Sequence, residues 1–129
     1  METSPSEGES NLNDLKHIAI DKLEQELSPS LPSIVAFSLP VCPPCKVAKE
    51  ALHFLLIEEK LFRAQLLFAY LDFDEEIQAN QKKKYKLSMF PTLRIYNDAS
   101  VIAEKRGAQH QSLVGTVDSY KRWIKRHWL

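Results

Sequence analysis

The stretch SIVAFSLPVCPPCKVAKEALHFLL, residues 33–56, joins a short apolar run to a helical pattern through two cysteines three positions apart. Residues 33–38 are apolar and partly β-branched, which is typical of a buried strand. Two adjacent prolines separate Cys42 from Cys45. After the cysteines, apolar residues recur at helical spacing, namely Ala48, Ala51, Leu52, Leu55 and Leu56. We therefore predict a strand that leads through a Cys-Pro-Pro-Cys motif into a helix.

The two prolines fit the first turn of this helix if Cys42 is its N-cap. Pro43 and Pro44 then occupy the N1 and N2 positions, where a backbone N–H has no acceptor within the helix. The N–H of Cys45, at N3, is the donor that an N-cap side chain normally satisfies, and here that side chain ends in sulfur. A thiolate at this position meets the positive end of the helix dipole. We therefore expect the pKa of Cys42 to lie below the ~8.5 of a free cysteine.

Cys42 is thus the predicted nucleophile and Cys45 the predicted resolving cysteine. The N-cap to N3 spacing falls within the ~4.4–6.8 Å between Cα atoms that a disulfide requires. Cys45 can then attack a mixed disulfide on Cys42 and release the partner. Inert buried cysteines, and a metal or iron–sulfur site, are the alternatives. Zinc usually takes ligands in paired spacing, whereas the histidines stand singly, at His17, His53, His110 and His127.

Composition favours one soluble domain. A chain of 129 residues can bury a core unaided, and 44% hydrophobic with 26% charged residues is ordinary. Basic and acidic residues number 17 each, so charge gives no reason to expect nucleic acid or a membrane as partner. No apolar stretch reaches the ~18–20 residues that span a bilayer, and the acidic start is unlike a signal peptide. We expect a cytoplasmic monomer.

We divide the chain into a flexible tail, residues 1–13, and one domain, residues 14–129. The domain begins either with a strand at 17–20 and a helix capped by Asp21, or with one amphipathic helix over 14–27. Further along, we predict a buried strand at 66–71, a helix at 75–85, a hairpin at 92–96 and 101–106, and a last helix at 111–128. This order predicts an α/β fold, with a mixed sheet flanked by helices on both faces.

Three segments resemble the thioredoxin family. Residues 37–46, FSLPVCPPCK, resemble its active-site segment, in which a strand runs into a CxxC followed by Lys. Residues 89–93, MFPTL, match the loop that carries a cis-proline beside the disulfide, and residues 106–108, RGA, match the glycine segment of the substrate groove. Their order and spacing agree with the family over about residues 16–127. The resemblance implies the thioredoxin fold and a cis Phe90–Pro91 bond.

The resemblance also implies a function. A protein of this family would act as a thiol–disulfide oxidoreductase that reduces protein disulfides through Cys42 and Cys45, without a metal or organic cofactor. Its partners would be disulfide-containing proteins and a recharging reductase or glutathione. The Phe90 backbone would pair with an extended peptide. By position, the groove would comprise Val41, Pro43, Pro44, Phe73, Phe90, Pro91, Gly107 and Ala108, although an ordinary core, turn or surface position is the better interpretation of Phe73.

The chain departs from the thioredoxin pattern at two places. Thioredoxins usually have Trp where this chain has Ser38 and Val41, and a buried Asp with a nearby Lys where it has Ala36 and Tyr70. Since general-base catalysis contributes ~10²–10⁴ in rate, we expect slow turnover, with Asp72 a weak candidate for the base.

Two alternative functions stay open. One is a thioredoxin-fold interaction protein, or adaptor, whose redox activity is weak or regulatory. The other is a glutathione-linked, glutaredoxin-like enzyme. Against the second, the residues before Pro91 do not resemble the Thr-Val that usually precedes the corresponding proline in that family.

Overall fold

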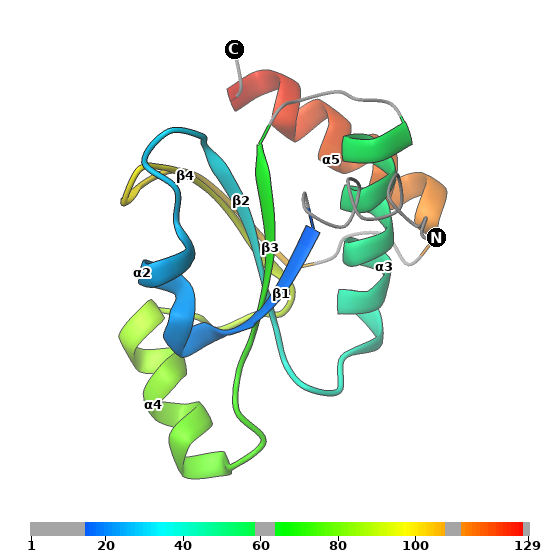
Figure 1. Ribbon diagram of the computed structural model, residues 1–129. Coiled ribbons are helices and arrows are strands. Elements are labelled where there is room, and N and C mark those ends of the chain that lie inside the picture. Colours follow the sequence, from blue (N-terminus) through cyan, green and yellow to red (C-terminus); the bar gives the residue numbers. More distant parts are fainter. Residues whose placement is uncertain (1–14, 59–63, 108–111, 128–129) are drawn as a thin grey trace, which may run out of the picture.

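The computed structural model of the protein describes residues 15–58, 64–107 and 112–127 (Figure 1). The predicted tail, residues 1–13, lies outside them. The centre is a five-stranded sheet in the order β1-β3-β2-β4-β5. Strands β1 and β2 both run parallel to β3, whereas β4 is antiparallel to β2 and β5 to β4. The strands are β1 Leu15–Ala19, β2 Ser33–Ser38, β3 Gln65–Tyr70, β4 Thr92–Asn97 and β5 Ser100–Arg106.

Helices cover both faces of this sheet (Figure 1). On one face lie α3, Pro43–His53, its π-helical continuation η2, Phe54–Glu58, and α5, Leu113–His127. On the other lie the 3-10 turn η1, Ile20–Lys22, the short α2, Leu23–Glu26, and α4, Glu75–Tyr85. The predicted thioredoxin fold, a mixed sheet flanked by helices on both faces, is therefore confirmed.

Both faces of the central strands are buried. Along β2, the side chains of Ile34 and Ala36 join the core under α3 and α5, and those of Val35 and Phe37 join the core under α2 and α4. All six residues of β2 are buried, which explains why this strand is a continuous apolar run rather than an alternating one. Each fully buried Leu, Ile or Phe contributes about 1.5–3 kcal/mol relative to exposure, so the two cores hold the helices on the sheet.

The start of the domain corrects the sequence interpretation. Residues 15–19 form strand β1, so the single helix over 14–27 is wrong. The strand and short helix of the other interpretation are present, but Asp21 does not cap the helix. Its carboxylate instead accepts a hydrogen bond from Gln81 Nε2 at 3.3 Å. Strand β1 pairs with β3 along its whole length, from Leu15 to Ala19. Pairing between segments that are distant along the chain leaves no periodic pattern in the local sequence.

The remaining predicted elements are present with small shifts in their bounds. Helix α4 begins where Asp74 accepts the N–H groups of Glu76 and Ile77, both at 3.0 Å, and ends at the left-handed Lys86. The hairpin of β4 and β5 turns through Asp98, whose φ of 61° is a conformation that Asp tolerates. In α5, Tyr120 and Ile124 are buried as expected from their spacing, but Leu113 is exposed.

Candidate active site

The cysteines lie where the strand β2 gives way to α3. Cys42 is the N-cap of α3, with an extended backbone, and Pro43 and Pro44 occupy the first two helical positions. Cys42 and Cys45 form a disulfide, with 5.2 Å between their Cα atoms. The expected hydrogen bond from the Cys45 N–H to the Cys42 sulfur is absent. That N–H donates to the Cys42 carbonyl oxygen at 3.0 Å, since the sulfur is bonded to its partner cysteine.

The two cysteines differ in exposure. Cys42 is partly exposed, whereas Cys45 lies one turn into the helix and is only 6% exposed. A partner protein can therefore reach the sulfur of Cys42 more readily than that of Cys45. This asymmetry agrees with attack by Cys42 and resolution by Cys45.

The Phe90–Pro91 peptide bond is cis, as the resemblance implied. Strand β4 begins next to it at Thr92, which pairs with Phe37 near the end of β2, so the cis-proline loop and the Cys-Pro-Pro-Cys motif lie at the same end of the sheet. The Thr92 hydroxyl donates to the Met89 carbonyl at 2.7 Å, and this bond ties the loop to β4.

Gly107 follows β5 at this same end of the sheet, and its N–H donates to the Pro91 carbonyl at 2.7 Å. Its φ of 74° lies in the left-handed region that favours glycine. A Cβ atom there would lie 2.9 Å from Cε at the flexible end of Met89, so the backbone conformation, more than this contact, favours glycine. The sequence analysis did not select Met89, although it stands inside the quoted MFPTL segment.

The predicted groove residues differ in exposure. Val41 and Phe73 are each 78% exposed, so Phe73 belongs to the surface rather than the core. Pro43 and Pro44 are exposed and Phe90 is half-buried, while Pro91 and Gly107 are buried; Ala108 lies outside the described residues. Exposed apolar side chains gathered at one end of a sheet are typical of a protein-binding surface.

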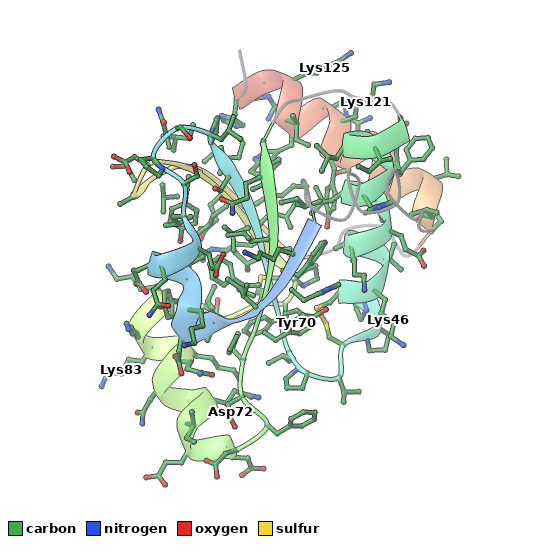
Figure 2. The ribbon with its side chains drawn as sticks, viewed as in Figure 1. Lys46, Tyr70, Asp72, Lys83, Lys121 and Lys125 are labelled. Carbon is green, nitrogen blue, oxygen red and sulfur yellow. A yellow bond between two sulfur atoms is a disulfide. The ribbon has the colours of Figure 1, made fainter. Side chains whose placement is uncertain are left out.

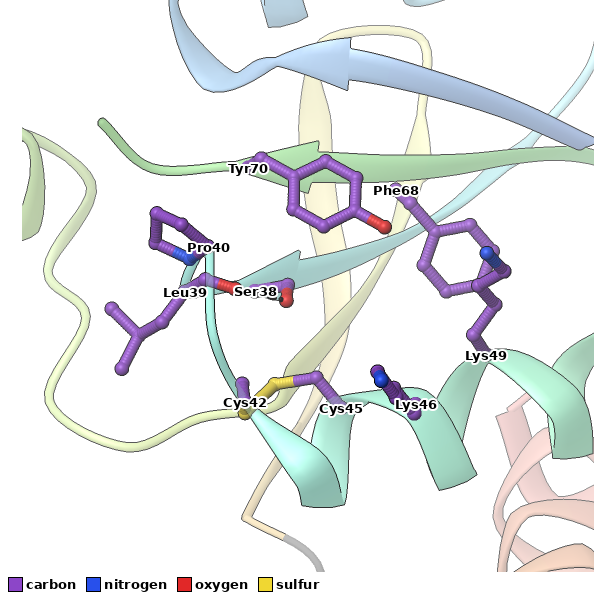
Figure 3. Close-up of a pocket in the computed structure, with 9 residues that line it drawn as sticks. All are labelled: Ser38, Leu39, Pro40, Cys42, Cys45, Lys46, Lys49, Phe68 and Tyr70. Carbon is purple, nitrogen blue, oxygen red and sulfur yellow. Dashed lines mark hydrogen bonds between the residues drawn. A yellow bond between two sulfur atoms is a disulfide. The ribbon is translucent and has the colours of Figure 1, made fainter. Parts of the chain in front are cut away.

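A hollow of about 120 Å³ lies beside the disulfide, between α3 and β3 (Figure 3). The sequence analysis named Tyr70 and Ser38 there only as departures from a family pattern, and it missed Lys49. Its described lining consists of Ser38, Leu39, Pro40, Cys42, Cys45, Lys46, Lys49, Phe68 and Tyr70. The hollow is open to solvent on a face of α3 that carries lysines.

Asp72, the candidate base, does not line this hollow. It is exposed in the turn before α4, where its carboxylate accepts the N–H of Asp74 at 2.8 Å (Figure 2). Ala36, at the position where the resemblance implies a buried acid, is 1% exposed. The structure therefore brings no carboxylate from these two positions to Cys45.

Among the residues that the structure describes, no group of three or more His, Cys, Asp or Glu side chains is placed to hold a metal ion. In the same ranges, no helix is long and apolar enough to cross a membrane.

Comparison with known proteins identifies the family. The thioredoxin family model matches residues 14–119, and the chain therefore belongs to the thioredoxin family. With the cysteine pair at the active-site position, this membership supports thiol–disulfide oxidoreduction at the level of the family. A search of curated protein sequences finds no match.

Solved structures show the same fold. Oxidised thioredoxin O2 from Arabidopsis thaliana is 20% identical, with a TM-score of 0.63, and the match covers 92% of this chain and 97% of that one. Thioredoxin f2 from Chlamydomonas reinhardtii is 20% identical with a TM-score of 0.59, covering 88% and 96% of the two chains. The thioredoxin of Malassezia sympodialis is 15% identical with a TM-score of 0.59, covering 89% and 91%. At these identities the structures show the fold alone.

Proposed function

We propose that the protein is a protein-disulfide reductase, in which Cys42 attacks the substrate disulfide and Cys45 resolves the intermediate. The observation that carries the proposal is the disulfide at the start of α3, with a partly exposed Cys42 and a buried Cys45. The partners are proteins with accessible disulfides, and a reductase or glutathione restores the dithiol. We also propose a monomer that works in the cytoplasm, where thiols are kept reduced.

The reaction follows from this geometry. The Cys42 thiolate, favoured by the N-terminus of α3, attacks one sulfur of the substrate disulfide and displaces the other sulfur as a thiolate, which takes up a proton. Cys45 then loses its proton and attacks Cys42 Sγ, so the mixed disulfide breaks and the second substrate thiolate leaves. Two electrons pass from the dithiol to the substrate. The Cys42–Cys45 disulfide seen in the structure is the oxidised product.

The exposed apolar side chains around the disulfide supply the docking surface in this proposal. Val41 directly precedes the motif, Phe73 follows β3, whose end pairs with the end of β2, and Phe90 precedes the cis-proline. Lys82 Nζ lies 5.7 Å from the centre of the Phe90 ring, so a cation stands at the rim. An extended peptide could pair with the Phe90 backbone while its apolar side chains contact this rim.

Insulin reduction tests the proposal. With dithiothreitol as the reductant, the protein should accelerate insulin precipitation, and the Cys42→Ser variant should not exceed the background rate. Cys45→Ser should retain the attacking thiol and accumulate mixed disulfides through Cys42, which mass spectrometry detects. Equal rates for the wild type and Cys42→Ser would instead support the thioredoxin-fold interaction protein. Equal trapping by the two variants would reverse the roles of the cysteines.

A further inference from the structure

Lys49 shares a helix face with the resolving cysteine. Cys45 and Lys49 are four residues apart in α3, a spacing that brings Cβ atoms to about 5–6 Å. In Figure 3 the side chain of Lys49 extends from α3 toward Phe68 of β3, one helical turn beyond Cys45. The side chains of both residues line the hollow beside the disulfide (Figure 3).

Among the described residues, the lining of the hollow includes cations and hydroxyl groups but no carboxylate. Its polar lining consists of the ammonium groups of Lys46 and Lys49, the hydroxyls of Ser38 and Tyr70, and the cysteine sulfurs. Within the described ranges, neither lysine forms an ion pair. A thiolate forming at Cys45 would therefore meet positive charge, with no neighbouring anion in the lining except a thiolate on Cys42.

The groups on the neighbouring strands add no opposing charge. His17 of β1 lies against Phe68 and Tyr70, with 5.6 and 5.7 Å between ring centroids. Burial and, next, the charge of Lys49 lower the pKa of His17, which favours the neutral imidazole. Burial raises the pKa of Tyr70, whose phenol is also neutral. From β2, only the uncharged Ser38 faces the hollow.

We propose that Lys49 is a positioning residue that promotes the resolving step by favouring the thiolate of Cys45. This proposal rests on the proposed function, in which Cys45 must lose a proton before it attacks the mixed disulfide on Cys42. The proton passes to solvent water, which the open hollow admits beside the sulfur. Lys49 thus does by electrostatic attraction part of what a carboxylate base would do by accepting the proton.

Lys46 and Lys49 both line the hollow, but they differ in exposure. Lys46 is exposed, whereas Lys49 is half-buried, so the charge of Lys49 is less screened by water and salt. Lys83 provides a matched control, because it is an exposed lysine on α4, across the sheet from α3 (Figure 2).

The test measures the acidity of Cys45 directly. In Cys42→Ser, Cys45 is the only cysteine of the chain, so a protein labelled with ¹³Cβ-cysteine gives one NMR signal whose shift follows ionisation. Adding Lys49→Gln should raise the midpoint of this titration by about 0.5–1 pH unit. Lys49→Arg should restore it, and Lys83→Gln should change it by less than ~0.2 unit. An unchanged midpoint in Lys49→Gln, or a larger shift in Lys46→Gln, would overturn the proposal.

A kinetic measurement separates this role from a structural one. In otherwise wild-type protein, Lys49→Gln should slow the release of the substrate thiol from the mixed disulfide about 3–10-fold at pH 7, since the thiolate population falls in that proportion. The two rates should converge at high pH, whereas a packing defect would slow release at every pH and count against the proposal. If insulin reduction fails but Lys49→Gln still shifts the titration, the proposed function fails and the effect of Lys49 on Cys45 stands.

Discussion

The face of the sheet under α3 and α5 is packed by apolar side chains with a few buried hydroxyl groups, such as those of Thr116 and Ser119, whereas the face under α2 and α4 also buries the charged Arg94 and the amide of Gln81. On the second face, Arg94 donates to Glu104 Oε2 at 2.7 Å and to the Tyr85 carbonyl at 2.7 Å, with its guanidinium 4.9 Å from the centre of the Phe37 ring. The Tyr85 hydroxyl lies 3.2 Å from Glu24 Oε1, and burial with the nearby Glu24 raises the pKa of Tyr85 to about 12.

This difference between the two faces affects the redox chemistry, because the disulfide lies on the face under α3 and α5. Three described acidic groups bond to core side chains, and all three lie on the opposite face, namely Asp21, Glu24 and Glu104. Beside the disulfide, the ionisable lining apart from the cysteines consists of Lys46, Lys49 and Tyr70. Buried polar contacts thus stabilise the fold on one face of the sheet. On the other face, the charged side chains beside the cysteines are lysines.

The largest expected effect comes from placing an acid on the apolar face. Ala36→Asp buries a carboxylate at a position that is 1% exposed, so we expect a loss of about 3–5 kcal/mol in the free energy of unfolding at pH 7. Urea denaturation measures it. Burial should raise the pKa of this new Asp, so the loss should shrink as pH falls and the group is protonated. Ala36→Asn is the control of similar size, and it should show no such pH dependence.

Breaking the polar network tests the other face. Arg94→Met removes the partner of Glu104 and the donor to the Tyr85 carbonyl, so we expect a loss of about 2–4 kcal/mol in urea denaturation. Arg106 donates to the same carboxylate at 2.9 Å from a much more exposed position. Arg106→Met should therefore cost less than about 0.5 kcal/mol. Equal losses of unfolding free energy in Arg94→Met and Arg106→Met would show that the burial of Arg94 does not increase its contribution to stability.

Removing the Tyr120 hydroxyl tests the cost of burying a polar group on the face under α3 and α5. The Tyr120 hydroxyl is buried there and, among the described residues, has no hydrogen-bond partner. Tyr120→Phe should raise the free energy of unfolding by roughly 1 kcal/mol, because it removes a desolvated polar group without changing the ring. Thermal or urea unfolding measures the change. A loss of stability would mean that the hydroxyl has a partner in the folded protein.

The smallest expected effect is the acid sensitivity of Glu104. Burial by itself raises the pKa of Glu104, but hydrogen bonds from Arg94 and Arg106 outweigh it, and the net pKa lies below 4.5. The stability contributed by this group is therefore present above pH ~4.5 and is lost as pH falls through the folded-state value. The carboxylate is partly exposed and screened, so the effect should stay below ~1 kcal/mol. Comparing wild type with Glu104→Gln between pH 3 and 7 measures it, and identical profiles would contradict the assignment.

Local patterns predicted most of the fold. The apolar run of β2, the helical spacing of α3 and the alternation of β4 and β5 are patterns of residue type within short segments, so periodicity reveals them. The first strand was ambiguous, because β1 is held by its long-range pairing with β3. The charged Arg94 gave no sign of being buried, since its partners Tyr85, Lys86 and Glu104 come from other elements.

The spacing of the two cysteines, the prolines that let a helix begin between them, and the family all follow from the order of residues along the chain. The surroundings of the disulfide depend instead on how distant segments pack. The hollow forms where α3 lies over the end of β3, and Lys49 meets Tyr70 there although they are 21 positions apart in sequence. Packing of distant segments sets burial and charge around a sulfur atom, and no local pattern encodes that packing.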